Sequence, residues 1–502
     1  MINFKNNKLF SILSQYYLTK AFSFFSLSNV ISAITSLCIL AFYTKFLPPE
    51  DFGKISLMWI FVIIASTVID GRLNIAFSIK YYKVSKEENI KNIYTIFVYN
   101  LIVFSLVYFV FLLYPSLFQK ILKIQIITAD LNVVFFLILF MIFGNFYTNF
   151  LIVAQKPKSY FFMKLSFDVI YIISSLVYLI ILREGYISYL KAYLISYFIV
   201  AVIGLRFFFI NYKPCKKNII SVSNLKNLLR LGLPLVPTGL MLMLLTWADR
   251  YILNLYANLA IVGIYTVGYK FSGIIDSFVV TPFGQALSPM VFKQFAKSRD
   301  EYKKTMSRVF KYYWLVMSTI VIGYFVVLKE IYQLIINVKY IEGYNIIAIV
   351  LFGIILWGAT NLLGATIIMK EKTGKMFLFT SISVLVNIGL NFIFIPKYGM
   401  YGAAVTTLLS YILQFIMIFA YTQKLVFINY DYKFIFKSSF ISLCFFALIL
   451  FLSYLEINVI IRLSLKAISF LLFSVLAYKF LDLKGSIKGI LDYVIKPKES
   501  IS

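Results

Sequence analysis

Seven charged side chains lie within long apolar stretches of this sequence, and they are the first candidates for chemistry. They are Asp70, Arg72, Asp168, Asp249, Arg250, Lys270 and Asp276. A charge at the centre of a membrane helix costs about 2.5–3.5 kcal/mol on insertion scales, so each one indicates a function or a pairing partner. The chain contains no histidine, which removes the commonest metal ligand and the usual proton relay.

The three basic residues of this set suit an anionic ligand that carries a phosphate or diphosphate. Arg forks onto two phosphate oxygens, whereas Lys acts as a point charge. Arg72 and Lys270 are expected near the middle of their apolar stretches, so we predict that they line a central cavity and approach a diphosphate from opposite sides. Arg250 is expected close to an outer interface, where it would either contact the substrate or form an interfacial pair, because long side chains there extend toward water.

The four carboxylates are predicted to couple an ion or to pair with charges: Asp70, Asp168, Asp249 and Asp276. On a continuous helix, Asp70 and Arg72 would lie about 200° apart, so only one of them would face a lumen. Lys164 and Asp168 have the i, i+4 spacing of an intrahelical ion pair.

Helix-breaking residues interrupt two of the apolar stretches and are predicted to form hinges: Pro234, Pro237, Pro282 and Gly284. Proline removes a backbone donor and kinks a helix. The alternative interpretation is a static kink without motion.

The composition places these residues in a membrane protein. Of the 502 residues, 61% are hydrophobic and only 14% are charged, whereas soluble proteins carry about 25% charged residues. The three cysteines are too few and too scattered for a disulfide framework or a thiolate metal site. We therefore expect a polytopic membrane protein without metal or cofactor.

Fourteen stretches are apolar and long enough to cross a hydrocarbon layer of roughly 30 Å as helices. The predicted transmembrane helices are 21–45, 55–79, 93–114, 131–153, 161–182, 188–210, 231–255, 261–287, 310–328, 343–368, 376–396, 399–423, 438–455 and 463–481. The predicted fold class is therefore an all-α polytopic membrane protein.

The distribution of basic residues predicts the orientation of these helices. Of the 48 Lys and Arg residues, 34 fall in one alternate set of connections and 12 in the other. Basic residues concentrate in cytoplasmic loops, so both termini are predicted to be cytoplasmic. The net charge of +28 is then a topology signal, and no nucleic-acid partner is needed to explain it.

Comparison of the chain with itself indicates an internal repeat at an offset near 210. Gly53 and Gly263 end short connections after the first and seventh stretches, and later matches follow in the same order. Two six-helix lobes in the same orientation form a parallel repeat, which places a substrate path between them. The predicted domains are an N-terminal lobe at 1–212, a cytoplasmic linker at 213–230, a C-terminal lobe at 231–425, and two further helices with a cytoplasmic tail at 426–502.

Three blocks of sequence are similar to a known family. They are Phe46-Leu47-Pro48-Pro49-Glu50-Asp51-Phe52-Gly53, the segment 231–265 that begins Leu231-Gly232-Leu233-Pro234, and the segment 372–404 that includes Ile395-Pro396-Lys397-Tyr398-Gly399. These blocks resemble the Wzx-type polysaccharide repeat-unit flippases, which belong to the multidrug/oligosaccharidyl-lipid/polysaccharide flippase superfamily.

The resemblance implies a protein of the cytoplasmic (inner) membrane. It would flip undecaprenyl-pyrophosphate-linked oligosaccharide repeat units for O-antigen (lipopolysaccharide), capsule or exopolysaccharide biosynthesis, by alternating access. Its partners would be the lipid-linked oligosaccharide, the lipid bilayer, and a polysaccharide polymerase with a chain-length regulator. The sequence lacks a phosphate-binding Gly-rich loop, so transport is expected to proceed without ATP hydrolysis.

Three other interpretations remain. An enzyme is disfavoured, because no predicted extramembrane segment exceeds about 25 residues. A cation-coupled multidrug exporter of the same superfamily is the main alternative, and it would favour a lumen rich in acids and aromatics over one lined by bases. A scaffold that does not transport is disfavoured by the embedded charges.

Overall fold

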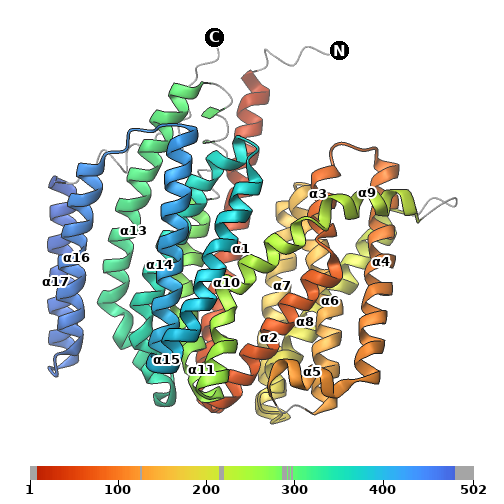
Figure 1. Cartoon of the computed structure of the whole chain (residues 1–502), viewed down its shortest axis with the longest axis horizontal. Helices are drawn as coiled ribbons and strands as arrows, with labels where there is room; N and C mark the ends of the chain where they lie inside the picture. The colour runs from red at the N-terminus through yellow and green to blue at the C-terminus, as the bar shows by residue number, and fades with distance from the viewer. Residues whose placement is uncertain are drawn as a thin grey trace. The chain divides into compact units, whose positions relative to one another are not determined.

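The computed structural model describes residues 8–124, 127–213, 220–284, 291, 294–295 and 298–480. Within these ranges every regular element is a helix, as Figure 1 shows. The predicted all-α fold is thus confirmed. Most of the predicted cytoplasmic tail and part of the predicted linker lie outside the described residues.

The chain divides into two units. Unit 1 comprises Met1–Val267 and Val384–Ala403. Its helices are α1 (Lys8–Phe46), α2 (Pro49–Asp70), α3 (Leu73–Lys80), α4 (Lys86–Leu113), α5 (Pro115–Leu122), α6 (Thr128–Val153), α7 (Pro157–Leu176), the π-helical turn η2 (Val177–Ile181), α8 (Ile187–Asn211), α9 (Val222–Gly232), α10 (Leu235–Tyr256) and the first half of α11 (Leu259–Ile275).

Unit 2 comprises Gly268–Ser383 and Ala404–Ser502. It contains the end of α11, the π-helical turn η3 (Asp276–Val280), α13 (Arg299–Ile335), the 3₁₀ turn η4 (Val338–Gly343), α14 (Tyr344–Met369), most of α15 (Thr373–Leu425), α16 (Tyr432–Tyr454) and α17 (Val459–Phe480). The helices α16 and α17 pack against each other and against α13 (Figure 1).

Helix length and composition support the membrane assignment. In the described part of the chain, 12 helices are long and apolar enough to cross a membrane, or 13 if the bent pair α9 and α10 is one span. The predicted number of fourteen stays a prediction.

The 53-residue helix α15 is a hairpin of two arms. It breaks at Gly399, whose φ of 54° and ψ of −130° are not helical. Gln414 donates a hydrogen bond of 3.1 Å to Thr380, 34 positions earlier, a separation of about 51 Å along a straight helix. The two arms therefore run antiparallel, and they coincide with the predicted stretches 376–396 and 399–423.

Local sequence determines where several helices begin. Pro49, Pro115 and Pro157 occupy first-turn positions, where a missing N–H group is not needed. Ser85 accepts a hydrogen bond from the backbone N–H of Glu88, and Asp431 accepts one from that of Phe434. Such caps satisfy backbone donors that have no partner within the helix.

Aromatic side chains fill much of the interior of unit 1. The ring centroids of Phe97 and Phe208 lie 5.5 Å apart, those of Phe150 and Phe208 4.9 Å, and those of Phe77 and Phe146 5.2 Å. The first two are edge-to-face pairs, a favourable arrangement that adds about 0.5–1.5 kcal/mol beyond burial. This packing holds α3, α4, α6 and α8 together, and so supports the end of α2.

The first turns of α2 and α11 make reciprocal contacts at the predicted offset. A Cβ atom built on Gly53 would lie 2.8 Å from the carbonyl carbon of Leu259, and one built on Gly263 would lie 2.8 Å from that of Pro49. The hydroxyl of Thr266 lies 3.0 Å from that of Ser56, 210 positions earlier. Reciprocal contacts are expected where equivalent elements meet across a two-fold axis, so they support the duplication.

Candidate functional site

The second predicted span is not one helix but two, and Arg72 lies at the break. α2 ends at Asp70, and the next two residues both adopt left-handed conformations, with φ of 57° at Gly71 and 56° at Arg72. α3 begins at Leu73. A left-handed conformation is ordinary for Gly but costs a non-Gly residue on the order of 1–3 kcal/mol, and such strain clusters at functional sites.

This break corrects two predictions. The separation of Asp70 and Arg72 by about 200° assumed a continuous helix, and the helix ends between them. Arg72 also follows the last residue of a 22-residue helix and does not lie midway along a span. Sequence periodicity could not reveal this, because Asp-Gly-Arg is too short an interruption to disturb the apolar pattern.

The helices α9 and α10 pack against this break. They are bent by 42° with respect to each other, and α9 lies beside α3 (Figure 1). A Cβ atom on Gly232 would lie 3.2 Å from the carbonyl oxygen of Arg72, and one on Gly239 would lie 2.6 Å from its Nε. The Arg72 side chain thus lies directly on the bare backbone of α10.

Arg72 has no counter-ion in contact. Its Nε is buried without a hydrogen-bond partner, and no ion pair of 4.0 Å or less among the described residues includes it. An unsatisfied buried donor costs about 1–3 kcal/mol, and more when it is charged. This state makes Arg72 a candidate for binding an anion.

Asp70 is held in place by uncharged partners. Its carboxylate is 7% exposed, accepts a long hydrogen bond of 3.5 Å from Asn100 Nδ2, and interacts with the backbone of Asn74. The Oδ1 atom of Asn100 is buried without a partner. Asp70 and Arg72 therefore interact electrostatically through space but do not form an ion pair within 4.0 Å.

Asp249 and Arg250 form a buried pair, which is one of the two alternatives predicted from the sequence; its position relative to a membrane interface stays a prediction. Both side chains are 1% exposed, and Nη1 of Arg250 lies 2.9 Å from Oδ1 of Asp249. The hydroxyl of Tyr265 donates a hydrogen bond of 2.5 Å to Asp249, and the Trp247 ring centroid lies 4.4 Å from the guanidinium carbon. The pair joins α10 to α11.

Asp168 has a different partner from the predicted one. The Ser32 hydroxyl on α1 donates a hydrogen bond of 2.5 Å to its Oδ2 atom. Nζ of Lys164 lies 5.4 Å from the centroid of the Phe167 ring. No ion pair of 4.0 Å or less joins Lys164 to Asp168, both of which are described. The carboxylate thus connects α7 to α1.

Lys270 lies on α11, and Asp276 is the first residue of η3. Lys270 is partly exposed, and Asp276 accepts a hydrogen bond of 3.0 Å from Thr281. Both residues belong to unit 2, whereas Arg72 belongs to unit 1, so the predicted approach of Arg72 and Lys270 to one diphosphate stays a prediction.

The predicted hinge residues all lie at irregular helices. Pro234 lies between α9 and α10 at the 42° bend, and Pro237 is in the first turn of α10. Pro282 follows the π-helical turn η3, which widens the helix where a proline ring would clash with the carbonyl of Phe278. Gly284 is the last residue of that segment described. The structure shows these irregularities, whereas bending of the helices at them stays a prediction.

The break after α2 and the end of the π-helical turn η3 fall at the predicted repeat offset. Gly71 and Thr281 are 210 positions apart; α2 ends before Gly71, whereas the helix containing η3 is irregular there but continues to Gly284. In repeat transporters, interrupted helices at corresponding positions are the best pointer to a binding site. This correspondence singles out Arg72 more sharply than its charge alone.

One buried charge cluster was missed by sequence reasoning. Glu330 on α13 accepts hydrogen bonds of 2.9 Å from Nε of Arg462 and of 2.9 and 3.1 Å from Nζ of Lys466. Lys466 is fully buried and Arg462 is 8% exposed. Arg462 and Lys466 have an i, i+4 spacing, which places both on one face of α17. The cluster attaches α17 to α13.

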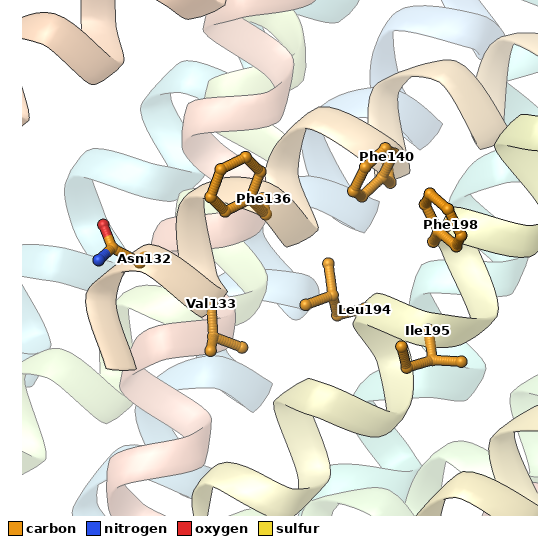
Figure 2. Close-up of a pocket in the computed structure, with 7 residues that line it drawn as sticks. All are labelled: Asn132, Val133, Phe136, Phe140, Leu194, Ile195 and Phe198. Carbon is orange, nitrogen blue, oxygen red and sulfur yellow. The ribbon is translucent and has the colours of Figure 1, made fainter. Parts of the chain in front are cut away.

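An apolar groove of about 330 Å³ lies between α6 and α8 (Figure 2). Its lining consists of Asn132, Val133, Phe136, Phe140, Leu194, Ile195 and Phe198. The Asn132 Oδ1 atom accepts a hydrogen bond from Tyr108, and no charged side chain lines the groove. It therefore cannot hold the diphosphate that the basic residues were predicted to bind. Among the described residues, no group of three or more His, Cys, Asp or Glu is placed to hold a metal ion.

Comparison with known proteins agrees with this architecture. The polysaccharide biosynthesis protein family matches residues 18–295, more than half of the chain. The capsular polysaccharide biosynthesis protein CapF of Staphylococcus aureus is 22% identical over 411 residues, which cover 80% of this chain and 98% of CapF.

Solved structures share the fold. The lipid II flippase MurJ in an inward closed conformation aligns with a TM-score of 0.70 and 18% identity, over 91% of this chain and 99% of its own. An inward-facing multidrug resistance transporter of the MATE family aligns with a TM-score of 0.67 and 13% identity, over 80% of this chain and 98% of its own. The resemblance found in the sequence is thereby confirmed: the chain belongs to the polysaccharide biosynthesis protein family and shares the fold of the lipid II flippase MurJ and of a MATE-family transporter.

Proposed function

We propose that the chain is a flippase that moves undecaprenyl-pyrophosphate-linked oligosaccharide repeat units from the cytoplasmic to the outer leaflet. The polymer supplied would be O-antigen, capsule or exopolysaccharide. Transport would proceed by alternating access without ATP hydrolysis. Membership of the polysaccharide biosynthesis family supports the substrate class, and the transporter fold supports movement across the membrane.

The main support for this proposal is the backbone conformation and the surroundings of Arg72. A strained arginine with a buried, unpartnered Nε at a helix break suits an anionic head group such as a diphosphate. With the predicted topology, the 22 residues of α2 traverse about 33 Å from the outer surface. Arg72 would then lie toward the cytoplasmic side, where the cargo enters.

Arg72 would receive the diphosphate near the cytoplasmic side. Lys270 would contribute a second positive charge to the cargo's path. Arg250 is occupied by Asp249 within unit 1, which supports a structural role for this pair. Asp70, Asp168 and Asp276, each hydrogen-bonded to neutral partners, are the candidates for ion coupling.

We also propose a membrane location and partner proteins. The protein would be a multi-pass component of the cytoplasmic membrane with both termini in the cytoplasm. A polysaccharide polymerase and a chain-length regulator would act on the flipped repeat unit. Pro234, Pro237, Pro282 and Gly284 would serve as bending points.

Deletion of the gene, followed by complementation, tests the function. We expect the deletion strain to lose surface polymer and to accumulate the lipid-linked repeat unit in the inner leaflet, measured by extraction and by a lectin added outside. Wild-type protein should restore export, Arg72→Ala and Lys270→Ala should not, and Arg72→Lys and Lys270→Arg should restore it partly. Loss of one charge-assisted contact costs about 1.5–3 kcal/mol, or roughly ten- to hundredfold in affinity.

Two results would contradict the proposal. Normal surface polymer with raised sensitivity to cationic drugs in the deletion strain would identify a multidrug exporter. Full export by both alanine variants at native expression level would show that the head group is held elsewhere.

A further inference from the structure

Two glycines, one on each side of the α9–α10 bend, contact the same residue of α2–α3. Gly232 is the last residue of α9, and Gly239 lies in the first turns of α10, seven positions later. The two helices are bent by 42° with respect to each other between these positions. Both glycines are buried, and both touch Arg72.

The two contacts fix different parts of Arg72. A Cβ atom on Gly232 would lie 3.2 Å from the Arg72 carbonyl oxygen and 3.3 Å from its carbonyl carbon, so Gly232 supports the left-handed backbone. A Cβ atom on Gly239 would lie 2.5 Å from the guanidinium carbon and would overlap Nη2. Only a residue without a side chain leaves the space in which the guanidinium lies.

We propose that Gly232 and Gly239 are positioning residues that hold the Arg72 guanidinium for the phosphate-bearing head group of the cargo. This inference rests on the proposed function, since it concerns how that binding group is held. The α9–α10 bend lies between the two glycines, so the angle of the bend sets where the backbone and the side chain of Arg72 are supported. The absence of a counter-ion at Arg72 agrees with this: backbone packing, and not an ion pair, determines where the charge lies.

Alanine at position 239 would place one methyl group where the Arg72 guanidinium lies. Neighbouring atoms essentially never approach a Cβ atom within 3.0 Å, so Gly239→Ala must displace the guanidinium. A misplacement of about 1 Å at a binding constellation costs up to roughly a hundredfold. We therefore expect a loss of anion affinity of ten- to hundredfold, although the alanine itself makes no contact with the anion.

The test measures binding of farnesyl diphosphate to the purified full-length chain in detergent by titration calorimetry, together with thermal unfolding. The variants are Arg72→Ala, Gly239→Ala and Arg72→Lys, with and without Gly239→Ala. Gly389→Ala is the matched control, because a Cβ atom there meets no other residue within 4 Å. We expect Arg72→Ala and Gly239→Ala each to weaken binding at least tenfold and Gly389→Ala to change it less than twofold.

The double variants separate positioning from general packing. Since the effect of Gly239→Ala acts through the guanidinium, it should shrink to less than threefold in the Arg72→Lys background, whose slender ammonium does not fill the same space. If Gly239→Ala alone does not fold, Arg72→Ala/Gly239→Ala should fold, because the overlapping group is gone. A double variant as unstable as the single one would overturn the inference.

Two further outcomes distinguish the inference from the proposed function. Wild-type affinity in Gly239→Ala, with weak binding in Arg72→Ala, would refute the positioning role and leave the anion site intact. Wild-type affinity in Arg72→Ala would refute the anion site itself, whatever Gly239→Ala does.

Discussion

At the scale of single residues, the structure sorts the embedded charges by what surrounds them. Asp249 and Arg250 neutralise each other in a buried pair. Asp168 accepts a hydrogen bond from the Ser32 hydroxyl, and Asp276 accepts one from the Thr281 hydroxyl. Arg72 has a buried Nε without a hydrogen-bond partner and, unlike Arg250, no carboxylate within 4.0 Å among the described residues; its guanidinium lies against the bare backbone of Gly239. A short list of similar charges thus separates into structural pairs and one anion-binding candidate.

The Asp249–Arg250 pair gives the residue-scale prediction. Arg250→Leu should destabilise the protein by about 3–5 kcal/mol, because it leaves a buried carboxylate without its counter-charge. The double variant Asp249→Asn/Arg250→Leu should recover most of that loss. Thermal unfolding in detergent measures both effects.

Lys54→Ala is the control for this prediction. Lys54 pairs with Asp51 at 3.4 Å, but both side chains are partly exposed, at 28% and 20%. Removal of such a pair should cost no more than about 1 kcal/mol. If Arg250→Leu unfolds at the same temperature as wild type, the pair is not a stabilising contact.

At the scale of elements, the helices are interrupted where the chain has to change direction or expose backbone. α2 breaks at two left-handed residues, α10 begins at a proline bend, and η3 widens before Pro282. α15 reverses completely at Gly399. Each interruption coincides with Gly or Pro, yet only the tertiary contacts distinguish a bend from a reversal.

The reversal in α15 gives the element-scale prediction. Gly399 has a φ of 54° and a ψ of −130°, a conformation that essentially only glycine adopts without strain. Gly399→Ala should therefore destabilise the protein by about 1–3 kcal/mol, although a Cβ atom there meets no other residue within 4 Å. The folded fraction and the unfolding temperature measure this cost.

The control lies in the same helix. Gly389 also has open space around a built Cβ atom but lies in the helical arm, so Gly389→Ala should stabilise by about 0.5–1 kcal/mol. The two substitutions add the same methyl group. Equal effects of the two would show that the backbone conformation at Gly399 is not the cause.

At the scale of the whole molecule, internal contacts and charge distribution bear on the predicted duplication and orientation. Ser56 contacts Thr266, 210 positions later, and the contacts of Gly53 with Leu259 and of Gly263 with Pro49 are reciprocal around that offset. The basic residues divide unequally between the two sets of connections. Together these features favour a parallel repeat with both termini in the cytoplasm.

Reporter fusions test this topology. Fusions should report the outer side at residues 50, 120, 185, 257, 335 and 397. The physical reason is the excess of Lys and Arg in the alternate connections, which are retained in the cytoplasm. A cytoplasmic signal at two or more of the six positions would overturn the predicted orientation.

The membrane class, the helical fold and the family followed from the sequence, because each depends on a property that many residues share. Apolar composition requires membrane helices, since only a helix satisfies its own backbone in lipid. The repeat was detectable because glycines such as Gly53 and Gly263 are needed wherever two helices approach closely. The blocks that resemble the flippase family were long enough to be specific.

The roles of individual charges were decided by tertiary structure alone. Periodicity describes a continuous helix, so it could not show that Asp70 ends α2 or that Arg72 rests on Gly239. The same limit left the burial of Arg250 open and overlooked Glu330, because burial depends on neighbours distant in the sequence. The sequence alone therefore determined the membrane class and the helical fold, because both follow from apolar stretches that are continuous along the chain. Which charge is left without a partner was decided only when the helices packed, because pairing is a property of three-dimensional neighbours.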